Sequence, residues 1–372
     1  EAARTLGIGP WRAFFTVSLP LARPAIATGV ALALMETLAD YGTVAYFAVN
    51  TFTTGIYRAW FSLGDRIASA QLAAILLGFV LLLVAVERIT RGRARYHNTS
   101  NRPRPSAGRL RGSAALLASL ACLTPLALGF LLPAGLLLRM ALGEGDAQFG
   151  ERFAILARNS FTLAGLTALV AVMLAVVLAY SARLSKTLLA QGLNRLVGLG
   201  YAVPGTVIAV GVLIPVTRLD NWLAGQWESA FGSNPGLLLT GGIAALIYAY
   251  LARFLSVALQ TVETSLSKIT PSMDDAARSL GLGQGRTLRR VHLPILRGSL
   301  FTAGLLVFVD VMKELPATLV MRPFNFDTLA TQAYTLASDE RLAEASTAAL
   351  AIVAVGLLPL IALSRQISLA RK

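Results

Sequence analysis

Four carboxylates stand in two pairs of equal spacing and are the side chains best suited to handle a cation. Glu36 and Asp40 form the first pair, and Asp310 and Glu314 form the second. Residues four apart lie on one face of a helix. Ionised carboxylates at membrane depth are costly and mostly face a bundle interior or water, and hard cations prefer oxygen ligands. The four residues are therefore candidates for lining a cation pathway.

An alternative interpretation places the same carboxylates at the outer membrane interface as surface ion pairs. Lys313 precedes Glu314 and lies three residues after Asp310, so it could neutralise either one. Ion pairs near helix ends are common, and both interpretations stay open at this point. The acidic residues favour a positively charged substrate but do not identify it. They also do not define a set of metal ligands.

The chain has few residues that could support catalysis. His97 and His292 are its only histidines, which leaves no Ser-His-Asp arrangement and no histidine metal cluster. The sequence contains no Gly-Lys dipeptide, so it lacks the phosphate-cradling loop of P-loop ATPases. We predict a protein that is not an enzyme, has no catalytic residues and binds no cofactor itself.

The composition is that of a membrane protein. Hydrophobic residues make up 55% and charged residues 14% of the chain, against about 25% charged in soluble domains, and mean hydropathy is +0.65. A membrane helix needs roughly 20 mostly apolar residues. We predict an all-α, multi-pass helical bundle in membrane lipid. Its expected eight spans are Ala22–Ala39, Ala70–Val86, Ser113–Leu138, Ser160–Tyr180, Leu196–Val216, Leu237–Ser256, Ser299–Met312 and Ala343–Leu363.

The fifth of these stretches contains Pro204, Gly205 and Pro215. Proline and glycine inside a span usually mark a kink or a close helix contact. We therefore expect a packing kink there, with a direct role in a pathway as the alternative.

Basic residues predict how the spans are oriented. Eight arginines lie between Glu87 and Arg111, and loops rich in Lys and Arg stay on the cytoplasmic side. With residues 1–21 placed inside, both chain ends and residues 260–297 also fall inside. The net charge of +14 then reflects membrane orientation, and we predict no nucleic-acid partner.

A segment at the start of the sequence recurs later at a constant offset. Glu1-Ala2-Ala3-Arg4-Thr5-Leu6-Gly7 matches Asp275-Ala276-Ala277-Arg278-Ser279-Leu280-Gly281, and Val17-Ser18-Leu19-Pro20 matches Val291-His292-Leu293-Pro294. Such a repeat sets the architecture. We predict two pseudosymmetric modules: residues 1–87 form the C-terminal part of the first, 88–112 a cytoplasmic Arg-rich linker, and 113–372 the second. The N-terminal part of the first module is expected to be missing.

The second copy has a predictable local structure. Thr261–Leu280 is expected to be helical, with Pro271 favouring a helix N-terminus and Gly281 suited to a left-handed C-terminal cap. Gln284–His292 is expected to form another helical stretch that ends at Pro294. Asp275 would offer a charge, and the small side chains of Ala276 and Ala277 would let a partner surface approach closely.

At these residues the sequence resembles the EAA loop of bacterial ABC importer permeases, whose pattern is EAA-x3-G-x9-I-x-LP. Both copies match it, with Asp275 for Glu and with Val17 and Val291 for Ile. The resemblance implies a cytoplasmic coupling helix that sits in a groove of a separate ATP-binding subunit, which would use ATP and Mg. The coupling residues it implies are Glu1, Ala2, Ala3, Gly7, Leu19, Pro20, Asp275, Ala276, Ala277, Gly281, Leu293 and Pro294.

Other segments resemble the fused, two-loop permeases of ferric-iron importers. They are residues 313–330, 38–47 and 53–57. The resemblance implies a type I importer fold in the bacterial inner membrane, two ATP-binding subunits and a periplasmic iron-binding protein. The alternatives are the same kind of permease for thiamine, a polyamine or phosphonate, and, from a different class, a secondary transporter.

Overall fold

The structure is a computed structural model that describes residues 7–91, 110–143, 150–185 and 187–370. These residues form helices and connecting turns, with no strand among them. Among the described residues, eight helices are long and apolar enough to cross a membrane, the number predicted. Their bounds are Trp11–Ala39, Arg66–Thr90, Ser113–Gly143, Glu151–Leu184, Gly205–Phe231, Ala244–Leu266, Gln284–Met312 and Leu342–Ile361.

The elements after the two repeated segments follow one another in the same order. In the first half these are α3 (Leu19–Ala39), α4 (Gly42–Tyr46), α5 (Phe52–Phe61) and α6 (Arg66–Arg91). In the second half they are α15 (Leu293–Met312), α16 (Pro316–Met321), α17 (Leu329–Ser338) and α18 (Leu342–Ala370). Between these two sets of helices, and inside the predicted second module, lie α7 (Ser113–Leu126), α8 (Leu132–Gly143), α9 (Glu151–Leu184), α10 (Leu188–Val197), α11 (Gly205–Phe231) and α12 (Ala244–Leu266).

The main core forms where α9, α12 and α15 pack together. One face of α9 carries Ala164, Ala168, Ala171 and Ala175, all buried at helical spacing. Small side chains let membrane helices approach closely, because van der Waals contact rather than water exclusion holds such helices together. A smaller cluster of buried apolar side chains, which includes Ile56, joins α5 and α6 to the start of α11.

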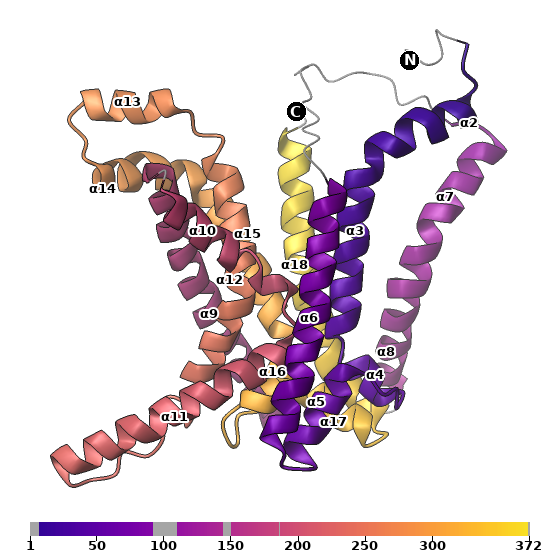
Figure 1. Cartoon of the computed structure of the whole chain (residues 1–372). Helices are drawn as coiled ribbons and strands as arrows, with labels where there is room; N and C mark the ends of the chain where they lie inside the picture. The colour runs from indigo at the N-terminus through magenta and orange to yellow at the C-terminus, as the bar shows by residue number, and fades with distance from the viewer. Residues whose placement is uncertain (1–6, 92–109, 144–149, 186, 371–372) are drawn as a thin grey trace.

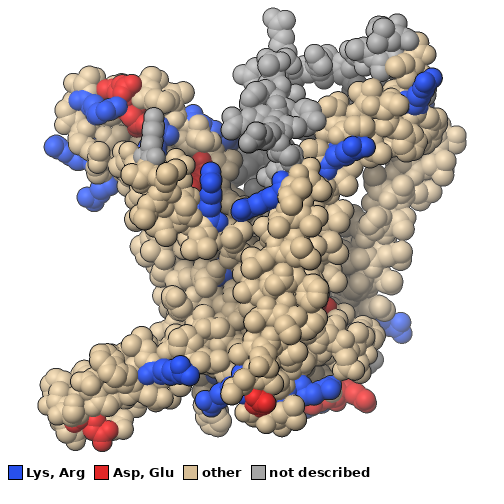
Figure 2. Space-filling view, in the orientation of Figure 1, with Lys and Arg blue, Asp and Glu red and all other residues tan. Residues whose placement is uncertain are grey.

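The helices converge at one end of the molecule and spread apart toward the other (Figure 1). α13 (Pro271–Ser279), α14 (Gln284–Thr287) and α2 (Pro10–Ala13) lie at the spread end, and α5, α16 and α17 lie at the other. The described part of the first repeated segment, which includes α2, and the second segment are thus on the same side of the bundle. Lys, Arg, Asp and Glu gather toward the two ends in Figure 2 and leave most of the middle uncharged, as a membrane-spanning surface requires.

The fifth span differs from the prediction. The predicted stretch Leu196–Val216 covers the end of α10, a short turn at Gly200–Ala202 and the first half of α11, and the helix long enough to span is Gly205–Phe231. Pro204 stands immediately before α11, so it begins a helix instead of kinking one, whereas Pro215 lies inside α11. Proline suits a helix start because it lacks the N–H that would go unpaired there.

Proline also fails to end the helix at the second repeat. The chain stays helical from Gln284 to Met312, and Pro294 is near the start of α15. A wide π-helical turn at Leu288–His292 precedes it, and the same turn at Phe14–Ser18 precedes Pro20. A π turn shifts the hydrogen-bond register, which accommodates the missing proline donor.

Candidate functional site

The second repeated segment forms a helix, a tight turn and a second helix at the spread end of the bundle. α13 begins with Pro271 at its N-terminus, as predicted, and Gly281 follows it with φ +76°. Gly7 in the first copy has φ +74°. A Cβ on either glycine would meet no atom within 4 Å, so backbone conformation and not space requires glycine there.

The predicted helix over Thr261–Leu280 is interrupted. α12 ends at Leu266 and α13 begins at Pro271. The residue before a proline is disfavoured in helical conformation, and Thr270 is extended with ψ 150°. This break turns α13 away from α12, so that α13 can lie across the end of the bundle (Figure 1).

The outward face of α13 is partly apolar. Met273 and Leu280 are exposed, as are Asp275 and Ala276. Asp275 pairs with Arg278 one turn along the same helix. Ala277 is buried within the chain, whereas Ala276 beside it is exposed. Glu1, Ala2 and Ala3 lie outside the described residues, while Leu19, Pro20, Leu293 and Pro294 lie at the starts of α3 and α15.

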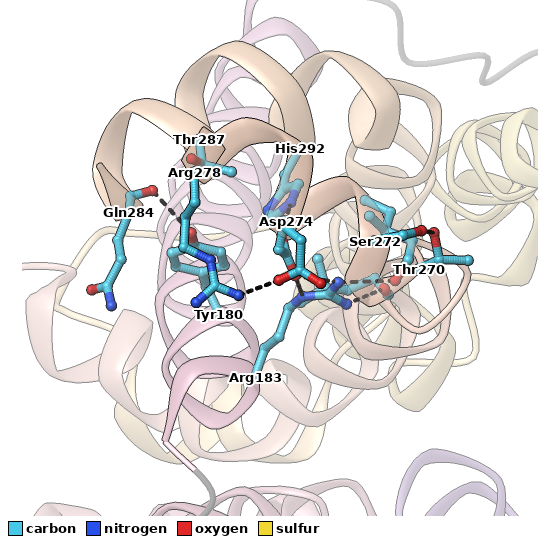
Figure 3. Close-up of polar contacts among 12 residues, drawn as sticks. Tyr180, Arg183, Thr270, Ser272, Asp274, Arg278, Gln284, Thr287 and His292 are labelled. Carbon is cyan, nitrogen blue, oxygen red and sulfur yellow. Dashed lines mark hydrogen bonds and ion pairs between the residues drawn. The ribbon is translucent and has the colours of Figure 1, made fainter. Parts of the chain in front are cut away.

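A polar network ties this second loop to the end of α9 (Figure 3). Arg183 donates from Nε and Nη2 to one carboxylate oxygen of Asp274, at 3.0 and 2.7 Å. Nε2 of His292 lies 2.8 Å from the other oxygen, and His292 is fully buried. Tyr180 donates its hydroxyl to the carbonyl of Gln284 at 2.9 Å. The loop is therefore held at several points rather than lying free on the surface.

The four predicted carboxylates meet around one cavity of about 490 Å³ between the ends of α3 and α15. Tyr201, Arg253 and Lys313 line it too. A second cavity of about 660 Å³ lies toward the spread end, and Tyr201 and Asp310 line both. The two cavities thus follow one another between the two halves of the bundle.

The structure divides the carboxylates into two kinds. Glu314 is buried and accepts from the backbone N–H groups of Ala317 and Thr318, each at 3.2 Å, at the start of α16. Asp40 accepts from the N–H of Thr43 at 3.3 Å, at the start of α4. These two carboxylates cap short helices. Glu36 and Asp310 lie one helical turn earlier in the sequence and also line the cavity. Neither of them caps a helix in the described part of the chain.

Ion pairs neutralise part of the acidic lining. Lys313 pairs with Asp310 at 3.0 Å, as the alternative interpretation proposed. Arg253 pairs with Glu314 at 3.2 Å, a contact that sequence reasoning missed because the residues are 61 apart. A Cβ on Gly205 would clash with the Glu314 carboxylate and crowd Arg253. Gly205 therefore leaves room for this buried pair.

No group of three or more His, Cys, Asp or Glu side chains within the described ranges has the geometry to hold a metal ion. Neither Glu36 nor Asp40 forms an ion pair in that part of the chain. The arrangement is a cavity lined by charged side chains of both signs. It does not resemble a permanent metal centre.

The fold is shared with a bacterial ABC transporter involved in the import of the acidic polysaccharide alginate. One chain of that crystal structure superposes with a TM-score of 0.50, covers 68% of this chain and 95% of its own length, and is 19% identical. At that identity the likeness concerns fold alone. With eight apolar helices in the described part of the chain, this fold is that of a multi-pass membrane protein.

Sequence comparisons give the class. Residues 1–95 match the family described as "Binding-protein-dependent transport system inner membrane component". The chain is 28% identical over 372 residues to the Fe(3+)-transport system permease protein FbpB 2 of Haemophilus influenzae, of which it spans 70%. It is 36% identical over 104 residues to the molybdenum transport system permease protein ModB of Escherichia coli, spanning 45% of it. This chain is an inner-membrane permease of the ABC importer class.

Proposed function

We propose that this chain is the permease of an ATP-driven importer that moves ferric iron from a periplasmic binding protein to the cytoplasm. The observation that carries the proposal is the pair of repeated loops. Each has a left-handed glycine, and both lie at the same end of the bundle. Lipid binding alone requires no such register, whereas docking of two similar subunits does.

Two ATP-binding subunits would dock on these loops from the cytoplasm. The exposed apolar side chains of Met273 and Leu280 suit a groove that excludes water. Binding and hydrolysis of ATP in those subunits would bias the bundle between two arrangements. The permease itself supplies no catalytic group, and both ends of the chain face the cytoplasm in this proposal.

Ferric iron is proposed as substrate from the likeness to the ferric permease and from the acidic cavity. Glu36 and Asp310 offer the oxygen ligands that hard cations prefer. Other cationic substrates, such as thiamine or a polyamine, fit the charge as well. An anionic substrate is the second candidate, because Arg253 lines the cavity and a molybdenum permease is among the relatives.

The test is uptake by vesicles that contain the permease with its ATP-binding subunits, supplied with the binding protein. Radioactive iron should accumulate only with ATP and with the binding protein present. A catalytically inactive ATP-binding subunit is the control. Accumulation of molybdate, phosphonate, thiamine or spermidine in place of iron would reassign the substrate while retaining the importer class.

A further inference from the structure

We propose that Arg183 is a positioning residue that locks the second loop to α9, so that a displacement of the loop is passed along α9 to the opposite end of the bundle. This inference rests on the proposed coupling function of the loop. Arg183 touches neither substrate nor nucleotide in this proposal. It acts through Asp274 and through the backbone around α13.

The contacts of Arg183 join three consecutive parts of the loop region. Besides Asp274, its Nη1 donates to the carbonyl of Leu266 and its Nη2 to the carbonyl of Ile269, each at 2.9 Å. The carbonyls at a helix C-terminus lack partners within the helix, and here one side chain supplies them. A guanidinium presents its donors in a rigid planar fork, so these bonds fix both the position and the direction of the turn before α13.

Two further contacts stiffen the same junction. The ring of Tyr180 packs edge-on against the ring of His292, with centroids 5.5 Å apart, and its hydroxyl binds the Gln284 carbonyl. Tyr180 and Arg183 are one turn apart on α9, so the end of α9 contacts the loop both before α13, through Arg183, and after it, through Tyr180. Figure 3 shows Tyr180 bonded to Gln284, and Arg183 bonded to Asp274.

α9 reaches from this junction to the converging end. It has 34 residues, which is roughly 50 Å of helix. Near its start, Ser160 accepts from the backbone N–H of Leu329 at 2.8 Å and Asn159 donates to the carbonyl of Asp327 at 3.0 Å. Leu329 begins α17, and Asp327 lies two residues before it. One rigid helix is therefore hydrogen-bonded to the second loop at one end and to α17 at the other.

This geometry makes Arg183 a connection rather than only a stabiliser. A helix transmits a displacement along its axis only if its ends are fixed to what moves. Without Arg183, α13 would keep its helical sequence and exposed docking face but would lose the fork that sets its direction. Docking of the ATP-binding subunit would then persist while its movement reached α9 less completely.

The experiment measures substrate imported per ATP hydrolysed in vesicles containing the whole importer. We expect Arg183→Met to lower this ratio at least tenfold, with subunit assembly and ATP hydrolysis retained. Arg183→Lys should give an intermediate ratio, because lysine can pair with Asp274 but lacks the planar fork for both carbonyls. Arg195→Met is the matched control, since Arg195 is an exposed arginine near the end of α10, and it should leave the ratio unchanged.

An unchanged ratio in Arg183→Met overturns the inference. If that variant does not assemble, Arg183→Lys decides, because a wild-type ratio there overturns the inference and a reduced one supports it. Gly281→Val, measured alongside, distinguishes the proposed role of Arg183 from the proposed coupling function of the loop. A coupling defect in Gly281→Val with normal Arg183 variants leaves the proposed function standing, whereas normal behaviour in both contradicts the proposed function itself.

Discussion

The hydroxyl of Tyr41 lies 3.1 Å from the hydroxyl of Tyr334, a residue 293 positions later in the chain. Tyr41 follows α3 in the first half, and Tyr334 is in α17 of the second. The ring of Tyr57 packs on Tyr41 with centroids 4.8 Å apart. This contact joins the two halves at the end where they converge, opposite the repeated loops.

Removing this hydroxyl pair should loosen the converging end. A hydrogen bond contributes about 1 kcal/mol net, so Tyr41→Phe should shift an open–closed equilibrium roughly fivefold toward separation. Distances between spin labels at Asn50 and Ser338, both exposed, would report it. Adding Tyr334→Phe to Tyr41→Phe should change the label distances little further. Tyr46→Phe is the control and should not change them. Additive effects of Tyr41→Phe and Tyr334→Phe would show that the hydroxyls do not act as a pair.

The same contact should be insensitive to pH around neutrality. Burial, followed by the hydrogen bond to Tyr334, holds the pKa of Tyr41 well above its ordinary value. A pKa raised in the folded state means that the contribution is complete below the unfolded value of about 10 and is lost only as pH rises through the folded value. The label distances should therefore agree at pH 6 and pH 9, and a difference between them would argue that the hydroxyls ionise in that range.

The glycines of the repeated loops should be sensitive to β-branched replacement. Gly7→Val with Gly281→Val should prevent assembly of the ATP-binding subunits or uncouple hydrolysis from uptake, because valine is strained at positive φ. Pull-down of the ATP-binding subunit and uptake by vesicles are the measurements. Gly281→Asn should be tolerated better, since asparagine adopts the left-handed region more readily. Gly285→Ala inside α14 is the control.

Surface labelling tests the orientation. With Cys122 changed to Ser, a cysteine at Ser272 should react with a membrane-impermeant reagent only from the cytoplasm, and one at Asn50 only from the periplasm. Basic loops predict this arrangement. Two further labelling positions are Asn98, expected on the cytoplasmic side, and Asp146, expected on the periplasmic side. Both lie outside the part of the chain that the structure describes. Labelling of Ser272 from the periplasm would invert the whole topology.

The carboxylates should separate into two phenotypes. Glu36→Gln and Asp310→Asn should reduce uptake severalfold while leaving the amount of assembled importer unchanged, because they face the cavity. Glu314→Gln should instead destabilise the protein by about 3–5 kcal/mol, since it leaves Arg253 buried without its counter-charge. Uptake and thermal unfolding of each purified variant distinguish these effects. Wild-type uptake by the double variant of Glu36 and Asp310 would remove both from the pathway.

Local features followed from local sequence. Eight apolar stretches give eight helices because backbone groups in lipid must pair within their own segment. Gly281 has the left-handed conformation predicted for it after α13, since glycine is the usual residue at such a helix end, and Gly7 at the matching position has the same conformation. The order of elements after each repeated segment also follows the repeat, because equal spacing of apolar and polar residues gives equal elements.

Contacts between distant residues were decided only by the tertiary structure. The repeat grouped Glu36 with Asp40 and Asp310 with Glu314 as equivalent pairs. All four line one cavity, but only Asp40 and Glu314 also accept hydrogen bonds from backbone N–H groups at the start of a helix.

Arg183 was, from the sequence, one basic residue among many in the loops, but it binds a carboxylate 91 positions away. Spacing along a helix determines which side chains share a face. Only the packing of one helix on another determines what that face meets, and the cost of burying an unpaired charge then selects its partner.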